Sequence, residues 1–200
     1  NTVSIQDGEG RAQYAQYANN DATSTSNAKG NQLTLVSKLQ NTVGNVLNNS
    51  SFEGANTWTI SSSAVTQTVS TDSAYYGSRS LKLSRSTSGS GDGVSGPSFA
   101  VKKGETYTFS AYLKTGNLSG YIALTNGTTT VTSTTVAANS DWTRVEVPFT
   151  ASDDTTVTPK LLVSGSGSMY MDCVQIEEAP TASRYNMVEN GDFRHGTEGW

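Results

Sequence analysis

The stretch ETYTFSAYLKT, residues 105–115, alternates between apolar and polar side chains along its length. Side chains two residues apart share one face of a β-strand, so this period predicts a strand with one face against a core. The expected core face carries Tyr107, Phe109, Ala111 and Leu113. Tyr112 then lies on the opposite face.

Two later stretches have the same period. In DWTRVEVPFT, residues 141–150, the core face is expected to carry Val145, Val147 and Phe149, and the other face Trp142, Arg144 and Glu146. In SMYMDCVQIEE, residues 168–178, strict alternation places Asp172 on the same face as Tyr170, Val174 and Ile176, and places Gln175 on the opposite face with Met171 and Cys173.

Short β-favouring segments, separated by Gly, Asn, Asp and Ser, continue on both sides of these stretches and predict an antiparallel sandwich or barrel. The expected strands are Trp58–Ser61, Ala64–Ser70, Ser80–Ser84, Val94–Val101, Glu105–Lys114, Gly120–Thr125, Thr130–Val136, Trp142–Thr150, Thr156–Ser164 and Ser168–Glu177. The stretch 86–97 is rich in Gly and Ser and is expected to be a mobile loop. It is not expected to bind phosphate, because it lacks the lysine and the strand-to-helix context of a phosphate-binding loop.

Composition narrows the function classes. The 200 residues include 28 Ser and 28 Thr, only 15% are charged, and the net charge is −4, which argues against a basic nucleic-acid-binding protein. No apolar stretch is long enough to span a bilayer, so no membrane insertion is expected. One Cys and one His exclude a disulfide framework and argue against triad catalysis.

Three regions are expected along the chain. Residues 1–44 have no sustained hydrophobic period and predict an irregular lead-in, which either packs as an added strand against the sandwich or ends a preceding region. NQLTLVSKLQ, residues 31–40, is compatible with a short strand or a helical turn. Residues 45–180 are expected to form the sandwich and residues 181–200 the start of a second repeat. The repeat rests on Asn45–Glu53, NVLNNSSFE, which aligns with Asn186–Arg194, NMVENGDFR. A tandem array of monomeric modules is the arrangement this repeat indicates.

Five segments occur in the order and approximate spacing of jelly-roll carbohydrate-binding modules: NNSSFEGANTWT, YYGSRSLKLS, KKGETYTFSAYLKT, WTRVEVPFT and MYMDCVQIEEAP. The sequence resembles this galactose-binding-like family over roughly residues 45–180. DGEGRAQYAQY, NTVGNVLNNSSFE and YNMVENGDFRHGTEGW also resemble the binding-module regions of bacterial RHS/YD-repeat surface proteins. The resemblance implies an extracellular or cell-surface location.

The resemblance also implies one structural calcium ion, with Glu53 and Asp172 as ligands beside backbone carbonyls. On the predicted register Asp172 lies among apolar side chains, and a buried carboxylate needs a cation or strong hydrogen-bond donors. Backbone N–H groups or a Lys or Arg partner for Asp172 are therefore the alternative to calcium.

Glycan recognition requires flat aromatic faces against the sugar ring and polar groups for its hydroxyls. The predicted face opposite the core supplies such groups from Tyr112, Tyr121, Trp142, Arg144, Glu146 and Gln175. Ordinary solvent-facing strand residues are the alternative for each of them. Trp58 is expected to close one end of the core, and Tyr75 and Tyr76 lie in a loop where they either line a site or cover the core.

The sequence therefore predicts an all-β, non-catalytic, carbohydrate-binding module of a bacterial surface or secreted protein. A structural spacer or protein-adhesion module of the same fold is the alternative, since fold alone does not determine function. A glycoside hydrolase would need two opposed carboxylates, and no recognisable catalytic motif accompanies Glu146 or Glu177.

Overall fold

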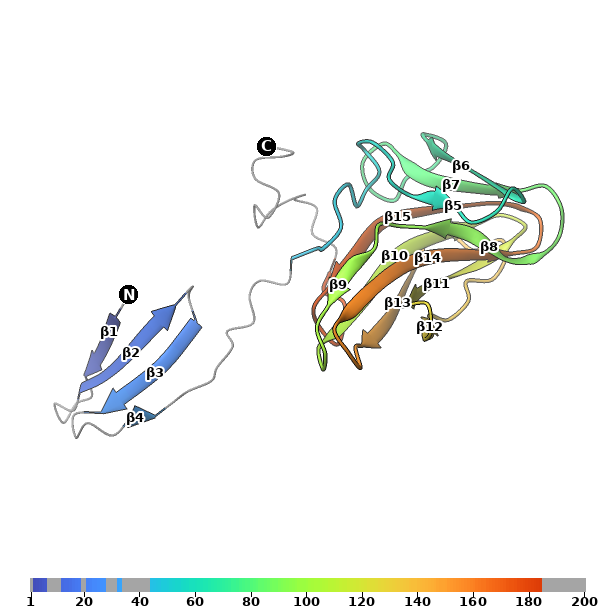
Figure 1. The fold of residues 1–200 in the computed structure, drawn as a ribbon. Helices are drawn as coiled ribbons and strands as arrows, with labels where there is room; N and C mark the ends of the chain where they lie inside the picture. The colour runs from blue at the N-terminus through green and yellow to red at the C-terminus, as the bar shows by residue number, and fades with distance from the viewer. Residues whose placement is uncertain (1, 7–11, 19–20, 28–31, 34–43, 185–200) are drawn as a thin grey trace. The chain divides into compact units, whose positions relative to one another are not determined.

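The computed structural model describes residues 2–6, 12–18, 21–27, 32–33 and 44–184. The chain divides into two compact units, Asn1–Thr42 and Val43–Trp200. The first unit contains a four-stranded antiparallel sheet in the order β1-β2-β3-β4, formed by Thr2–Gln6, Ala12–Ala18, Asp21–Asn27 and Gln32–Leu33 (Figure 1). The prediction of an irregular lead-in is wrong for these four strands. They are paired by backbone hydrogen bonds, which form without a periodic pattern of apolar side chains.

Two antiparallel sheets make up the second unit. The first has the order β13-β10-β15-β7-β6, from Thr143–Thr150, Thr106–Thr115, Gly167–Glu177, Ser80–Arg85 and Val65–Ser70. The second has the order β12-β11-β14-β8-β5, from Thr130–Thr132, Ser119–Thr125, Thr155–Ser164, Ser90–Ser95 and Thr59–Ile60, and β9 (Phe99–Val101) also pairs with β14. The expected antiparallel jelly-roll β-sandwich is confirmed.

The core lies between the two sheets and follows the alternation of the strands. All four apolar residues expected to face inward on β10 are buried, and so are Val145, Val147 and Phe149 on β13. Trp58 is buried at the expected position, with its ring centroid 6.4 Å from that of Phe52 and 6.4 Å from that of Phe109.

Glycine changes the predicted strands in one part of the second sheet. The expected loop 86–97 contains β8, in which Gly93 lies so close to β14 that an added Cβ would be 1.8 Å from the Leu161 carbonyl oxygen. The expected single strand 94–101 is interrupted at Gly96 and Pro97. Gly96 leaves room for the Trp58 ring, which would lie 2.8 Å from an added Cβ, and Pro97 has no N–H to donate to a ladder.

A β-bulge in β15 inverts the predicted faces of that strand's first half. Ile176 pairs with Phe109 and Gln175 with Ser110, but Asp172 pairs with Tyr112. The extra residue is accommodated by Cys173, whose φ of 50° lies in the left-handed region. Asp172 and Tyr170 therefore face away from the core while Met171 faces into it, which corrects the strict alternation assumed for residues 168–178.

The predicted second repeat from Asn186 lies outside the described residues. Within the described ranges, no helix is long and apolar enough to cross a membrane.

Candidate functional site

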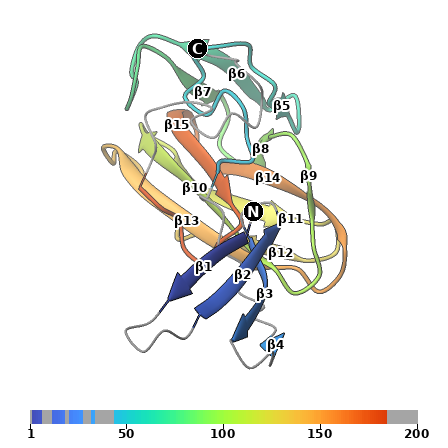
Figure 2. The ribbon, with the colours of Figure 1, turned by 90° about the vertical axis from the view of Figure 1, so that its left-hand side faces the viewer.

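The outer face of β13, β10 and β15, which points away from the core, carries five of the six predicted binding residues. These strands run side by side (Figure 2). Three rows of paired residues cross them: Arg144, Tyr112 and Asp172; Glu146, Ser110 and Gln175; and Pro148, Thr108 and Glu177. Trp142 directly precedes β13. The face therefore combines aromatic, cationic, amide and carboxylate groups.

An aromatic cluster of Tyr75, Tyr112 and Trp142 lies at one end of this outer face. The Tyr75 and Tyr112 rings are stacked, with centroids 3.7 Å apart and planes 15° apart, and the Trp142 ring is edge-on to Tyr75 at 5.9 Å. Tyr75 is 46% exposed, an unusual exposure for a large aromatic side chain in this fold. Stacking on Tyr112 uses one face of Tyr75, so its exposed surface belongs to the rest of the ring.

Asp172 holds the loop that carries Tyr75. Its Oδ2 accepts hydrogen bonds from the backbone N–H groups of Tyr75 at 2.7 Å and Tyr76 at 3.1 Å, and its Oδ1 accepts from the N–H of Cys173 at 2.7 Å. The side chain is fully buried, and this burial raises its pKa to about 6 although the three N–H donors lower it. Asp172 thus fixes Tyr75 over Tyr112 through the backbone.

Arg144 connects the aromatic cluster to the polar rows. Its guanidinium carbon is 5.9 Å from the Tyr112 ring centroid, and its Nη2 donates to Ser110 Oγ at 3.2 Å and to Gln175 Oε1 at 3.3 Å. Its Nε is buried and has no acceptor among the described residues. Gln175 is buried beside it, whereas Glu146 is exposed at the side of the face. Arg144 therefore keeps one unused donor, its buried Nε.

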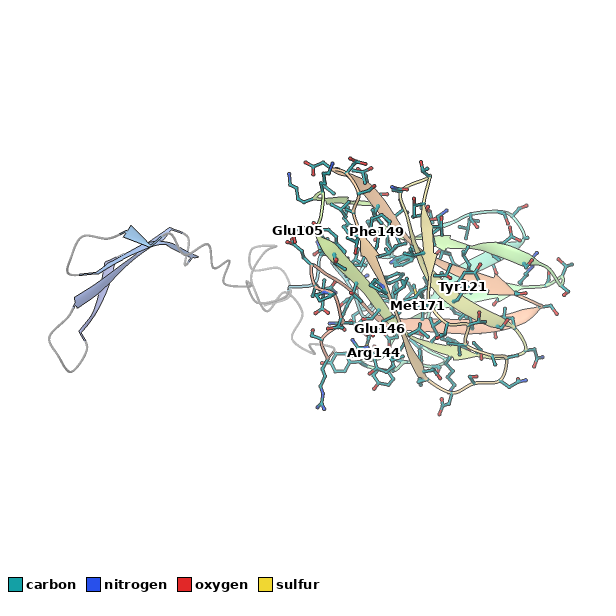
Figure 3. The ribbon with its side chains drawn as sticks, turned by 90° about the horizontal axis from the view of Figure 1, so that it is seen from below. Glu105, Tyr121, Arg144, Glu146, Phe149 and Met171 are labelled. Atoms are coloured by element: carbon teal, nitrogen blue, oxygen red, sulfur yellow. The ribbon has the colours of Figure 1, made fainter. Side chains whose placement is uncertain are left out.

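Tyr121 is the exception among the predicted binding residues. It lies on β11 in the second sheet, where it pairs with Leu162, while the neighbouring Ile122 pairs with Leu161 in the core. In Figure 3, the core residue Met171 lies between Tyr121 and the pair formed by Arg144 and Glu146. Tyr121 therefore points away from the opposite sheet, and the single shared face expected from sequence is corrected for this residue.

Glu53 and Asp172, the ligands implied for calcium, both accept hydrogen bonds from the loop of residues 75–79. Glu53 Oε1 accepts from the N–H groups of Ser78 at 2.7 Å and Arg79 at 2.9 Å, and its Oε2 accepts from the Ser78 hydroxyl at 2.8 Å. Desolvation raises the pKa of Glu53, but these hydrogen bonds together lower it further, so the pKa lies below its usual value. The hydrogen-bond partners of both carboxylates are N–H or hydroxyl donors, and the described residues hold no cluster of three or more His, Cys, Asp or Glu for a metal. The residues therefore do not fit the implied ion as they are placed.

Sequence reasoning left the roles of Tyr75 and Glu177 on this face open. Tyr75 was expected either to line a site or to cover the core, and nothing in the sequence indicated Tyr112, far away in the chain, as its partner. Glu177 is buried at the end of β15, where both its carboxylate oxygens accept hydrogen bonds from Ser183. Its strand parity was the only signal for its position, and nothing in the sequence indicated Ser183 as its partner.

Comparisons with known proteins agree with this architecture. Residues 44–166 match a family model described as a carbohydrate binding domain. No curated protein matches the sequence.

Several solved structures share the fold at low sequence identity. The C-terminal family 22 carbohydrate binding module of Clostridium thermocellum Xyn10B is 20% identical with a TM-score of 0.54, over 70% of this chain and 97% of that chain. The xylan-binding domain CBM22-1 of Paenibacillus barcinonensis Xyn10C is 20% identical with a TM-score of 0.50, over 66% and 93%. TmCBM61 in complex with β-1,4-galactotriose is 14% identical with a TM-score of 0.51, over 68% and 99%.

Proposed function

The chain belongs to the carbohydrate binding domain family, and from this membership we propose that the outer face of β13, β10 and β15 is its glycan-binding surface. The observation that carries this proposal is the aromatic cluster beside Arg144. The exposed part of Tyr75 offers an apolar surface for a sugar ring, and the unpartnered Nε of Arg144 offers a donor for a hydroxyl once its cover is displaced. The two kinds of contact lie next to each other, as sugar recognition requires.

Four of the six predicted residues contribute directly to this surface. Tyr112 supports Tyr75 from below, Trp142 borders it, and Arg144 and Gln175 form the polar part. Glu146 lies at the exposed side, where it is available to accept hydrogen bonds from hydroxyl groups. Tyr121 is left outside the proposed surface because it belongs to the other sheet.

The substrate class follows from the shape of the surface and not from the neighbours' ligands. A strand face with an exposed aromatic cluster at one end suits part of a glycan chain rather than an enclosed single sugar. Xylo-oligosaccharides and β-1,4-galactotriose are rational first probes, because structurally similar modules are a xylan-binding domain and a galactotriose complex. Binding at one such surface is expected to be weak and to strengthen when several modules act together.

The test is a binding panel of soluble xylo-, galacto-, gluco- and manno-oligosaccharides measured by calorimetry. The wild-type chain should bind at least one of them, Tyr112→Ala should reduce the affinity at least tenfold, and Tyr121→Ala should leave it unchanged. Loss of affinity in Tyr121→Ala alone would move the site to the other sheet. Absence of binding across a broad glycan panel would favour a structural spacer or protein-adhesion module.

We also propose that the module binds glycan without cleaving it. Glu177 is buried and engaged by Ser183, which leaves Glu146 as the exposed carboxylate on the proposed surface. Glycosidases use two carboxylates on either side of the scissile bond, whereas Glu146 and Glu177 both lie on the outer face of one sheet. Incubation of the chain with each oligosaccharide, followed by chromatography of the products, tests this directly.

The wider setting is proposed from sequence. The alignment of Asn45–Glu53 with Asn186–Arg194 supports a monomeric module in a tandem array, and the RHS/YD-like segments support a bacterial surface or secreted protein. The sequence of the region that follows Trp200 in the source genome tests the array, since a second module should continue there.

A further inference from the structure

The chain folds back over the proposed binding surface immediately after β15. Residues 179–184, here called the strap, begin with a turn in which the Ala179 N–H donates to the Glu177 carbonyl at 2.9 Å. The hydroxyl of Thr108 on β10 then donates to the Ala179 carbonyl at 2.7 Å. Arg144 on β13 donates from Nη2 to the Ser183 carbonyl. Because these partners lie on two different strands, the strap crosses the outer face rather than following its edge.

Ser183 makes the principal contacts of the strap. Its N–H donates to Glu177 Oε2 at 2.7 Å, and its hydroxyl donates to Glu177 Oε1. With the Arg144 contact, one residue supplies two donors to a carboxylate and one acceptor to a guanidinium. Neighbouring hydroxyls of a sugar offer the same chemistry, since each hydroxyl both donates and accepts. Ser183 therefore occupies a polar position that suits a pair of saccharide hydroxyls.

The strap satisfies this position only in part. The buried Nε of Arg144 has no acceptor among the described residues, even with Ser183 in place. The strap also offers little apolar surface for anchoring: Pro180, Thr181, Ser183 and Arg184 are exposed. Its displacement would expose little apolar area, while a ligand could replace its hydrogen bonds and add one to Nε.

We propose that the strap is an internal competitor, with Ser183 filling a saccharide-hydroxyl subsite formed by Arg144 and Glu177. This inference rests on the proposed function and concerns the regulation of the same surface. A glycan that reaches this end of the face must displace Ser183. The observed affinity is then the intrinsic affinity reduced by the fraction of molecules in which the strap is released.

The test compares Ser183→Ala with Thr181→Ala in the full chain. Ser183→Ala removes the hydroxyl contact to Glu177 and so favours strap release, whereas Thr181 is an exposed strap residue. Against the best-bound oligosaccharide of the panel, calorimetry should show about tenfold tighter binding for Ser183→Ala, as expected if about one molecule in ten of the wild type has a released strap. Thr181→Ala should match the wild type.

A second measurement does not depend on any variant. Amide hydrogen exchange at Ser183 should accelerate by up to about tenfold when wild-type chain is saturated with that oligosaccharide, because its N–H loses Glu177. Unchanged exchange at Ser183 on saturation, or unchanged or weaker binding by a folded Ser183→Ala, would overturn the competitor role and leave the proposed function intact. If neither the wild type nor Ser183→Ala binds any oligosaccharide, the competitor role and the proposed function are both overturned.

Discussion

Truncation of Tyr75 to alanine separates glycan binding from fold stability more cleanly than any other single change. The side chain is 46% exposed and its described ring contacts are with Tyr112 and Trp142. A stacked pair contributes about 1 kcal/mol beyond its buried area, so the module should lose about 1–2 kcal/mol of stability and remain folded. An aromatic anchor at the centre of a binding surface is worth about 2 kcal/mol or more, which corresponds to roughly thirtyfold in affinity.

Calorimetric titration with the best-bound oligosaccharide measures the affinity, and thermal unfolding checks the fold. Tyr75→Phe retains the ring and should bind within about threefold of wild type, whereas Tyr121→Ala removes a partly exposed tyrosine from the other sheet and should not change binding. A folded Tyr75→Ala that binds as tightly as wild type would refute the assignment of the aromatic cluster.

Three further predictions concern stability. Burial raises the pKa of the Asp172 carboxyl from 3.8 to about 6, so the folded state binds the carboxyl proton more tightly than the unfolded state does. The contribution of Asp172 to the free energy of unfolding is therefore fully present below pH 4 and is lost as the pH rises through 6. The lost stability is about 3 kcal/mol. Urea unfolding between pH 4 and 7 should show that the stability of Asp172→Asn depends less on pH than that of the wild type. The same pH dependence in both proteins would contradict a buried carboxyl at Asp172. Trp58→Ala should lower the free energy of unfolding in urea by about 4 kcal/mol, because the ring packs on Phe52 and Phe109. Trp58→Phe should lower it by less than half as much. Equal losses in the two variants would show that ring volume is unimportant at this position. The hydrogen-bond donors around Glu53 and Asp172 lead us to expect the same melting midpoint in millimolar calcium and in chelator, whereas a midpoint raised by calcium would restore the structural ion implied by the family resemblance.

The direction of the pH effect depends on which carboxylates dominate. The pKa values of Asp72 and Asp141 are lowered, mainly by hydrogen bonds from Lys82 and from the Trp142 backbone, respectively. Their contributions are lost as pH falls through their lowered folded pKa values, which is the opposite trend to that of Asp172. Stability should therefore be highest at mildly acidic pH.

Local alternation in the sequence was enough to predict much of the first sheet. The apolar residues of β10 and β13 recur at every second position, and each is buried between the sheets as expected. This prediction succeeds because side-chain direction in a regular strand depends only on local backbone geometry. The same local rule fails at Cys173, because a residue other than glycine takes a left-handed conformation there and shifts the parity of β15.

The candidate site illustrates the other limit. Alternation along each strand predicted that Tyr112, Arg144 and Gln175 point away from the core. They share one face because the three strands that carry them are neighbours in one sheet. Tyr121 has the same parity, but the sequence contains no information on which sheet β11 joins. Strand order depends on long-range pairing, so parity alone places a residue outward without saying on which side of the sandwich.

The sequence by itself determined most strands of the sandwich and the inward-facing residues of β10 and β13, because these depend on local period. The tertiary structure decided that Tyr75 stacks on Tyr112, that Asp172 is satisfied by backbone N–H groups, and that Ser183 lies on Arg144 and Glu177. These contacts join segments distant in the chain or depend on a turn after β15. They form only when the sheets pack and the loops cross them, so no local pattern contains them.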